Sequence, residues 1–95
     1  ALTSDHIKEI VKLNLAYLQH IMDQKHITLT SSPGAVEVLA KAGYDPKFGA
    51  RPIRRAIQEL VEDPLTVKYL DGAFKDGDEI KLIKKGSKID FEKVA

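Results

Sequence analysis

The chain contains no cysteine and no tryptophan, and aromatic residues make up only 6% of its 95 residues. Without cysteine there is no disulfide framework, no thiolate zinc site and no cysteine nucleophile. No apolar run approaches the ~20 residues that a membrane-spanning helix needs. Lys and Arg number 15 and Asp and Glu 14, so the formal net charge is +1. This balance argues against nucleic acid or an anionic membrane as the main partner.

Patterns for catalysis and metal binding are also missing. The chain has no glycine-rich loop ending in Gly-Lys-Ser/Thr, so by itself it offers neither a phosphate cradle nor a Mg²⁺ site. His6, His20 and His26 are the only histidines, and His20 and His26 are six residues apart across a helix end, so we expect surface or boundary histidines and no metal site. We identify no Ser, His and acid constellation for nucleophilic catalysis. We therefore expect the chain alone to be catalytically inactive.

The composition that remains, 43% hydrophobic and 31% charged, is typical of a soluble globular domain. The length fits a single domain over residues 1–95. The N-terminus lacks the basic and apolar segments of a signal peptide, and it does not begin with Met. We therefore expect one domain from a longer cytoplasmic chain.

A long amphipathic helix is predicted from about Ser4 to Gln24, with Thr3 or Ser4 as its cap and Asp5 in the first turn. Its apolar positions cover an arc of roughly 200°, about twice the usual core-facing stripe. The arc comprises Ile7, Ile10, Val11, Leu13, Leu15, Tyr17, Leu18, Ile21 and Met22, and it encloses Asn14. Either the small domain packs around this helix on several sides, or one side contacts something outside the chain.

The next segments predict a strand and a second helix. Residues 26–30 alternate and are rich in β-branched side chains, which favours a short strand. Ser31 or Ser32 followed by Pro33 is typical of a helix start. We expect this helix to end near Gly43, with that glycine as a left-handed terminator. A compact loop over residues 43–51 follows.

A third helix is predicted from Pro52, because apolar residues recur with helical spacing. These residues are Ile53, Ala56, Ile57, Leu60 and Val61. Asp63 and Pro64 predict that this helix ends and that a fourth begins, which stops at Gly72. Arg55 is one turn from Glu59 and two turns from Glu62, on the solvent side of the helix, so surface pairing explains these carboxylates.

The C-terminal part predicts a β-hairpin. Asp76 and Gly77 signal a turn, residues 79–84 alternate as a strand, and residues 85–87 reverse the chain into a last strand that ends near Glu92. The strand over residues 26–30 needs a partner, and the hairpin is the only candidate. The expected fold is therefore α+β, with about four helices packed on a small sheet of about three strands.

The strongest candidate site is Arg51, where the loop meets the third helix. Unpaired backbone N–H groups and the helix dipole favour anions at such a junction, and a guanidinium group suits phosphate oxygens. Gly43 and Gly49 permit backbone conformations that other residues resist. Arg51 could instead pair with an acidic neighbour or be solvated. For Arg54 and Arg55 a solvated or interface role fits better.

Two segments carry a resemblance to a known family. Residues 43–58 (GYDPKFGARPIRRAIQ) and residues 61–65 (VEDPL) resemble the C-terminal small domain of the Clp/ClpB family of AAA+ ATPases. ClpB-type disaggregases, in their second ATPase module, are most similar, and ClpC-type unfoldases come next. The resemblance covers nearly the whole chain, although Ile53 and Arg54 stand where relatives often carry Leu and Lys.

The resemblance implies a lid over a nucleotide that is bound to the large AAA+ domain of the same chain. Arg51 matches the sensor-2 arginine, which would reach the γ-phosphate of ATP, with Gly49 and Ala50 beside it as nucleotide-binding residues. ATP or ADP with Mg²⁺ is implied for the longer protein and none for this part alone. Also implied are a homohexamer in which the lid packs on the neighbouring subunit, unfolded or aggregated protein substrates, and a DnaK-type co-chaperone.

Two alternatives stay open. The first is the lid of a ClpC- or ClpA-type unfoldase that works with a peptidase. The second is a stand-alone module in which Arg51, Arg54 and Arg55 bind an acidic partner or nucleic acid. The balanced charge and the absence of aromatic residues at stacking spacing argue against the second alternative.

Overall fold

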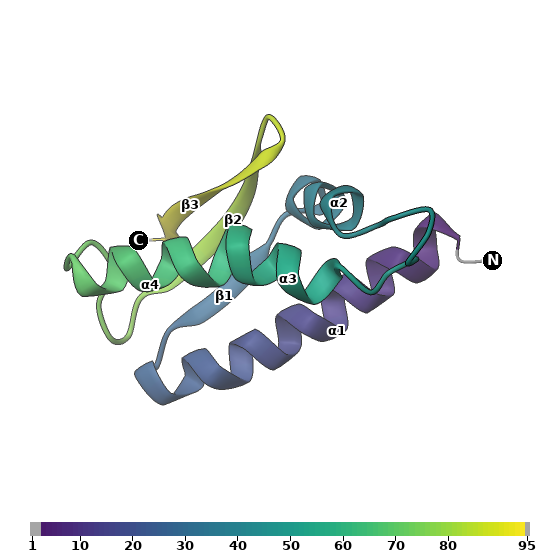
Figure 1. Cartoon of the computed structure of the whole chain (residues 1–95). Helices are drawn as coiled ribbons and strands as arrows, with labels where there is room; N and C mark the ends of the chain where they lie inside the picture. Colours follow the sequence, from purple (N-terminus) through teal and green to yellow (C-terminus); the bar gives the residue numbers. More distant parts are fainter. Residues whose placement is uncertain (1–2, 95) are drawn as a thin grey trace.

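The computed structural model describes residues 3–94. The helices lie on one side of a twisted sheet (Figure 1). In chain order the elements are α1 (Ser4–Met22), a 3₁₀ turn η1 (Asp23–Lys25), β1 (Thr28–Ser31), α2 (Pro33–Ala42), α3 (Ile53–Ile57), a π-helical turn η2 (Gln58–Glu62), α4 (Asp63–Leu70), β2 (Glu79–Lys85) and β3 (Lys88–Val94). The predicted α+β class is confirmed.

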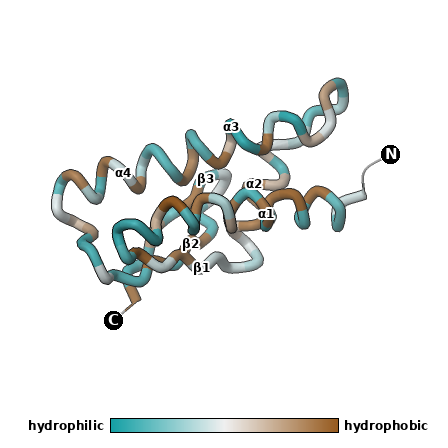
Figure 2. The backbone as a smooth tube through the Cα atoms, turned by 90° about the horizontal axis from the view of Figure 1, so that it is seen from below, coloured by the Kyte–Doolittle hydropathy of each residue, from teal (hydrophilic) through white to brown (hydrophobic). Residues whose placement is uncertain are grey.

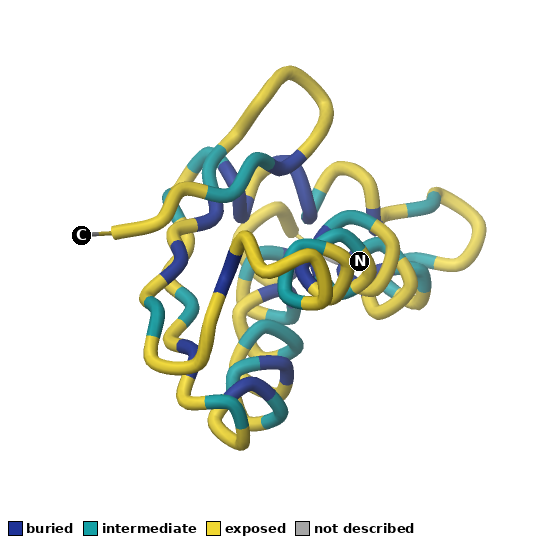
Figure 3. Tube along the Cα trace, turned by 90° about the vertical axis from the view of Figure 1, so that its left-hand side faces the viewer, coloured by how far each residue is buried: buried dark blue, intermediate teal, exposed yellow. Residues whose placement is uncertain are grey.

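The sheet has the order β1-β2-β3, so the hairpin is the partner of the early strand, as predicted. β1 runs parallel to β2, with Leu29 opposite Ile80, and β2 runs antiparallel to β3, with Leu82 opposite Phe91. A parallel pair needs a long crossover, which the helices between β1 and β2 supply. Ile80 and Leu82 of β2 are buried, Glu79 and Lys81 are exposed, and Ile83 is half-buried. Figure 3 shows how buried and exposed positions alternate along the chain.

Helix α1 has one buried side and one exposed side. Thr3 is its N-cap, because the Thr3 hydroxyl accepts a hydrogen bond from the His6 N–H at 3.2 Å. The buried stripe contains Ile7, Val11, Leu18 and Met22. Leu13 and Tyr17 are 70% and 58% exposed. The domain therefore does not cover the full apolar arc of this helix. Figure 2 shows the hydrophobic positions along the tube of α1.

Gly43 ends α2, but not in the predicted left-handed conformation. Its φ is −95° and its ψ is 4°, which other residues also adopt. A Cβ atom at this position would lie 2.6 Å from the Cα of Ile53. Glycine is therefore required by the close approach between the end of α2 and the start of α3. Ser32 caps the other end of α2 as predicted, since its Oγ accepts from the Ala35 N–H at 3.1 Å.

The predicted break at Asp63 and Pro64 is wrong, because α3, η2 and α4 form one continuous helix. Within residues 3–94 the structure thus has three long helical units instead of about four helices. Proline lacks an N–H group and its ring crowds the carbonyl four residues earlier. The wider π turn before Pro64, in which the Asp63 N–H donates to the Gln58 carbonyl, lets the helix pass the proline without ending.

The Gln19 side chain joins α1 to the outer edge of β1. Its Nε2 donates to the Ile27 carbonyl at 2.9 Å and to the Asp23 carboxylate at 2.7 Å, and its Oε1 accepts from the Leu29 N–H at 2.6 Å. These bonds use backbone groups that an open sheet edge would leave unpaired. In the described part of the chain, no helix is long and apolar enough to cross a membrane.

Candidate functional site

The loop before Arg51 is closed by its own hydrogen bonds. Asp45 and Gly49 exchange backbone bonds of 2.8 and 2.6 Å, and the Asp45 carboxylate accepts from the N–H groups of Lys47 and Phe48 at 2.7 and 3.1 Å. Gly49 has a φ of 67°, the left-handed region that glycine adopts readily, as predicted. The loop therefore delivers the chain to α3 in a defined conformation.

Arg51 presents an exposed guanidinium group at this junction. Its N–H donates to the Phe48 carbonyl at 3.3 Å, and its Cζ lies 5.6 Å from the centre of the Phe48 ring. A guanidinium group over an aromatic face is attracted to it and loses orientational freedom. Among residues 3–94 no carboxylate forms an ion pair with Arg51, so pairing with an acidic neighbour is not its role within this domain.

Arg54 and Arg55 are held differently from Arg51. The Arg54 guanidinium lies 5.6 Å from the ring centre of Tyr17, which joins α3 to the exposed side of α1. The Arg55 Nε donates to the Glu59 carboxylate at 2.9 Å on the solvent side, as its spacing predicted. The three arginines border an open hollow of about 520 Å³ together with Gln58, Glu59 and Asp63.

The backbone groups near Arg51 are largely used inside the loop. The Gly49 N–H donates to the Asp45 carbonyl, and the Ala50 carbonyl accepts from the Ile53 N–H at 3.1 Å. The group that this junction offers to an anion is therefore the Arg51 side chain. The roles of Gly49 and Ala50 in nucleotide binding stay predictions, and the structure gives them a part in shaping the loop.

A second hollow adjoins the arginines on the side of α1. It has a volume of about 270 Å³ and is lined by Asn14, Tyr17, Leu18, Ile21, Arg54, Ile57, Gln58 and Glu62. Asn14 is half-buried, and its Nδ2 donates to the Ile10 carbonyl of its own helix at 2.9 Å. Sequence spacing gave no sign that Tyr17 meets Arg54, since that contact depends on how α1 packs against α3.

The three histidines lie on the surface of the domain. His6, His20 and His26 are all exposed. Within residues 3–94 no group of three or more His, Asp or Glu side chains is arranged to hold a metal ion. His26 instead has a structural role: its φ of 55° turns the chain from η1 towards β1.

The comparison with known families decides the identity. Residues 2–82 match the family described as the C-terminal, D2-small domain, of ClpB protein. The chain belongs to the ClpB D2-small family. The match includes the whole arginine-bearing loop and all three helical units, and it confirms the resemblance seen in the sequence. The chain is therefore the lid domain of a Clp-type ATPase.

Individual relatives agree with this assignment. The D2-small domain is 44% identical over 80 residues to Chaperone protein ClpB 1 of Thermosynechococcus vestitus, covering 84% of this chain and 9% of that protein. It is 49% identical over 79 residues to the chloroplastic ClpB2 of Oryza sativa, covering 83% of this chain and 8% of that protein. The ATP-binding subunit ClpC of Staphylococcus epidermidis is 38% identical over 91 residues, 96% of this chain and 11% of that protein. The chain thus spans about a tenth of these relatives.

Proposed function

We propose that this D2-small domain closes over ATP bound to the large AAA+ domain of the same, longer chain, and that Arg51 is its sensor-2 arginine. The observation that carries the proposal is the state of Arg51: its guanidinium is exposed, has no carboxylate partner within residues 3–94 and lies over the Phe48 ring at the loop–helix junction. A fixed positive charge of this kind suits a γ-phosphate supplied from another domain.

The physical logic of a lid arginine follows from phosphoryl transfer. Catalysis there depends on positioning and on neutralising charge, and a preorganised guanidinium supplies both. If Arg51 contacts the γ-phosphate, the closed lid is stabilised with ATP and less so with ADP. Hydrolysis then changes the lid angle, because a ligand shifts an equilibrium through its differential contacts with two states. The large domain would hold the Mg²⁺ and the phosphate loop.

The exposed side of α1 supports the proposed homohexamer. Leu13 and Tyr17 leave apolar area uncovered, and the large domain of the neighbouring subunit is the partner that we propose for it. By analogy with relatives named chaperone proteins, the ring would act on unfolded or aggregated proteins with a DnaK-type co-chaperone. A cytoplasmic location belongs to the same proposal, although one relative is chloroplastic.

A ClpC-type unfoldase is the second candidate. The similarity to the ClpC subunit of a Clp protease extends over 96% of this chain, and the similarity to one ClpB relative extends over 100%, so coverage does not separate the two. The features that would separate the two lie in the rest of the longer protein. Adding the cognate peptidase to the hexamer and measuring degradation of an unfolded substrate distinguishes a protease partner from a disaggregase.

The decisive test is the Arg51→Ala substitution in the longer protein, with ATP binding and hydrolysis measured separately. We expect binding to change little and turnover to fall by about 10²-fold, the scale for loss of one preorganised donor to a developing charge. Arg51→Lys, which keeps the charge but loses the planar fork, should rescue only part of the activity. Lys47→Ala removes a charge from the same loop as a matched control. Unchanged turnover in Arg51→Ala would leave Arg51 a structural loop residue.

A further inference from the structure

The turn of the β2–β3 hairpin carries a second, separate concentration of positive charge. Lys84, Lys85 and Lys88 flank the turn, and Lys41 reaches the same region from the last turn of α2. All four side chains are exposed. The formal net charge of the whole chain is only +1, so this charge is a local feature and not a property of the surface at large.

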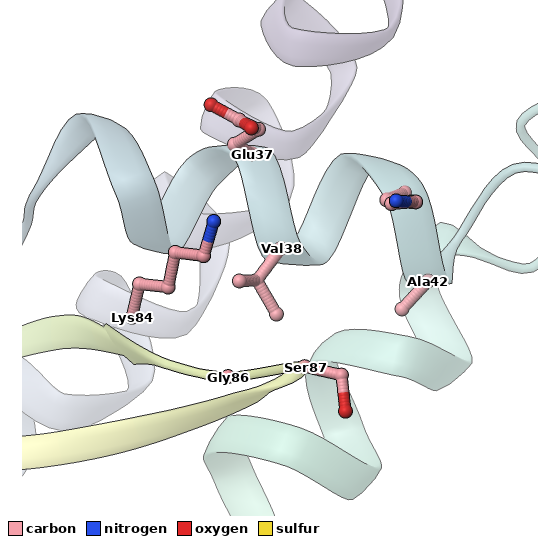
Figure 4. Close-up of a pocket in the computed structure, with 7 residues that line it drawn as sticks. Glu37, Val38, Ala42, Lys84, Gly86 and Ser87 are labelled. Carbon is pink, nitrogen blue, oxygen red and sulfur yellow. The ribbon is translucent and has the colours of Figure 1, made fainter.

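A groove runs past this turn, and we call it the lysine groove. It consists of two hollows of about 460 and 420 Å³ that share Ala42 and Ser87. The first lies between α2 and the hairpin, and the second lies between the hairpin and the helix α3–η2. The first hollow is shown in Figure 4, where Val38 and Ala42 point from α2 towards Gly86 and Ser87. Ala56 and Leu60 line the second hollow, so both have apolar walls.

The charges at the rim of the groove are not neutralised within the domain. Among residues 3–94, no ion pair involves Lys41, Lys84 or Lys88. Glu37 lines the first hollow, but in Figure 4 its carboxylate lies on the far side of α2 from Val38. In the second hollow Arg55 and Glu59 pair with each other at 2.9 Å. The groove therefore combines apolar walls with unpaired lysines.

We propose that the lysine groove binds an acidic, extended segment of a partner protein. Apolar side chains of the segment would enter the two hollows, and its carboxylates would lie against Lys41, Lys84 and Lys88. Complementary charge steers such a partner and fixes its register, while the apolar contacts supply affinity. This site is a protein-docking function in addition to the nucleotide lid, and it does not depend on Arg51.

The lining favours a polypeptide over other anionic partners. None of the residues that line the two hollows is aromatic, so bases have no stacking platform. The large hydrophobic side chains exposed within residues 3–94, such as Leu13, Phe48 and Leu70, all lie outside the groove, so it offers no apolar wedge to a membrane. An acidic peptide with interspersed apolar residues complements both the positive charge of the lysines and the apolar walls of the hollows.

The test measures binding of a fluorescent twelve-residue peptide, made of Asp and Glu with two leucines, to the 95-residue chain by anisotropy. We expect saturable binding that weakens as salt is raised. In the triple variant Lys41→Gln/Lys84→Gln/Lys88→Gln, affinity should fall by about tenfold, the combined effect of three exposed charge contacts. Ala42→Gln keeps every lysine but fills the junction of the hollows, and it should weaken binding to a similar extent.

Matched controls separate this site from general electrostatics. The variant Lys8→Gln/Lys12→Gln/Lys75→Gln removes the same charge from outside the groove and should bind the peptide like the unmodified chain. A peptide with Asn and Gln in place of the acids should bind at least tenfold more weakly. The proposal is overturned if the unmodified chain shows no saturable binding or if both triple variants bind equally. It is also overturned if a single-stranded oligonucleotide or anionic vesicles bind more tightly than the peptide, or if the chain self-associates through the groove.

Discussion

Positive charge is concentrated in two regions of this domain, and the two regions hold it differently. At the start of α3, Arg51 and Arg54 each lie 5.6 Å from the centre of an aromatic ring, that of Phe48 or Tyr17. In the lysine groove no aromatic ring within residues 3–94 lies beneath Lys41, Lys84 or Lys88. These two arginines thus each have an aromatic neighbour, whereas the three groove lysines are exposed and make no ion pair or ring contact within residues 3–94.

The difference fits the two kinds of recognition that we propose. A planar guanidinium that is already oriented suits a single phosphate at a fixed place. The entropy cost of ordering its side chain has then been met before binding. An extended segment with several carboxylates is met well by flexible ammonium groups that follow its course. The scaffolds differ in the same way: the arginine loop is closed by hydrogen bonds around Asp45, whereas the lysines flank an open hairpin turn.

The largest expected effect comes from comparing one substitution, glycine to alanine, in the two regions. At Gly43 the new Cβ would lie 2.6 Å from the Cα of Ile53, so Gly43→Ala should lower the free energy of unfolding by about 2–3 kcal/mol. At Gly86, in the hairpin turn, φ is 62° and no atom lies within 4 Å of the added Cβ. There only the conformational cost of about 1 kcal/mol applies.

Urea denaturation of both variants measures the two free energies under the same conditions. If Gly43→Ala were no more destabilising than Gly86→Ala, the close contact between Gly43 and Ile53 would not require glycine. Gly43→Ala should also weaken the nucleotide response of the longer protein, because it displaces the junction that carries Arg51.

Local signals in the sequence predicted much of the fold. Caps at Thr3 and Ser32, and turns at Gly72 and Gly77, depend on residues within a few positions, and the structure has them where they were expected. The predicted helix break at Pro64 is wrong because the local rule that proline ends a helix is outweighed by the packing of the residues around it. Val61 and Leu65 on either side of the proline are both buried, and a π turn keeps them on one face.

Long-range contacts were beyond prediction. The sequence predicted Gly43 at the end of α2 as a left-handed terminator. The structure instead requires glycine there because Ile53, ten positions away, approaches it closely. The bonds of Gln19 to Ile27 and Leu29 depend on how α1 meets β1. At the candidate site, the sequence placed Arg51 at the loop–helix junction, but the ring beneath its guanidinium follows only from the closed loop.

A smaller effect is expected from removing the ring under Arg51. Phe48 is 50% exposed, so Phe48→Leu should change the stability of the domain little. An exposed cation–π contact contributes about 0.5–1 kcal/mol, so ATP turnover of the longer protein should fall about twofold to fivefold. Tyr44→Leu, at another exposed ring of the same loop, is the control. Equal turnover in the two variants would show that the ring does not position Arg51.

The smallest effect concerns pH, and it is expected at the base of the hairpin and not at the arginines. The Lys75 N–H donates to the Asp78 carboxylate at 2.9 Å, and the Lys93 ammonium lies 3.3 Å from it, so the pKa of Asp78 is held below its usual value of 3.8. A carboxyl group whose pKa is lower in the folded state stabilises the fold above the unfolded pKa, and this stabilisation is lost as the pH falls below 3.8.

Denaturant unfolding between about pH 5 and pH 2 should therefore show a steeper loss of stability in the unmodified chain than in Asp78→Asn. Asp71→Asn, which removes an exposed carboxylate elsewhere, controls for the change in net charge. Parallel curves for the unmodified chain and Asp78→Asn would show that these bonds do not favour the ionised carboxylate. The arginine contacts should not contribute to the slope, because guanidinium groups stay charged throughout this range. Acid therefore weakens the bonds of Asp78 at the base of the lysine-bearing hairpin, whereas the ring contacts of Arg51 and Arg54 persist. The two regions thus differ in how their contribution to the free energy of unfolding depends on pH.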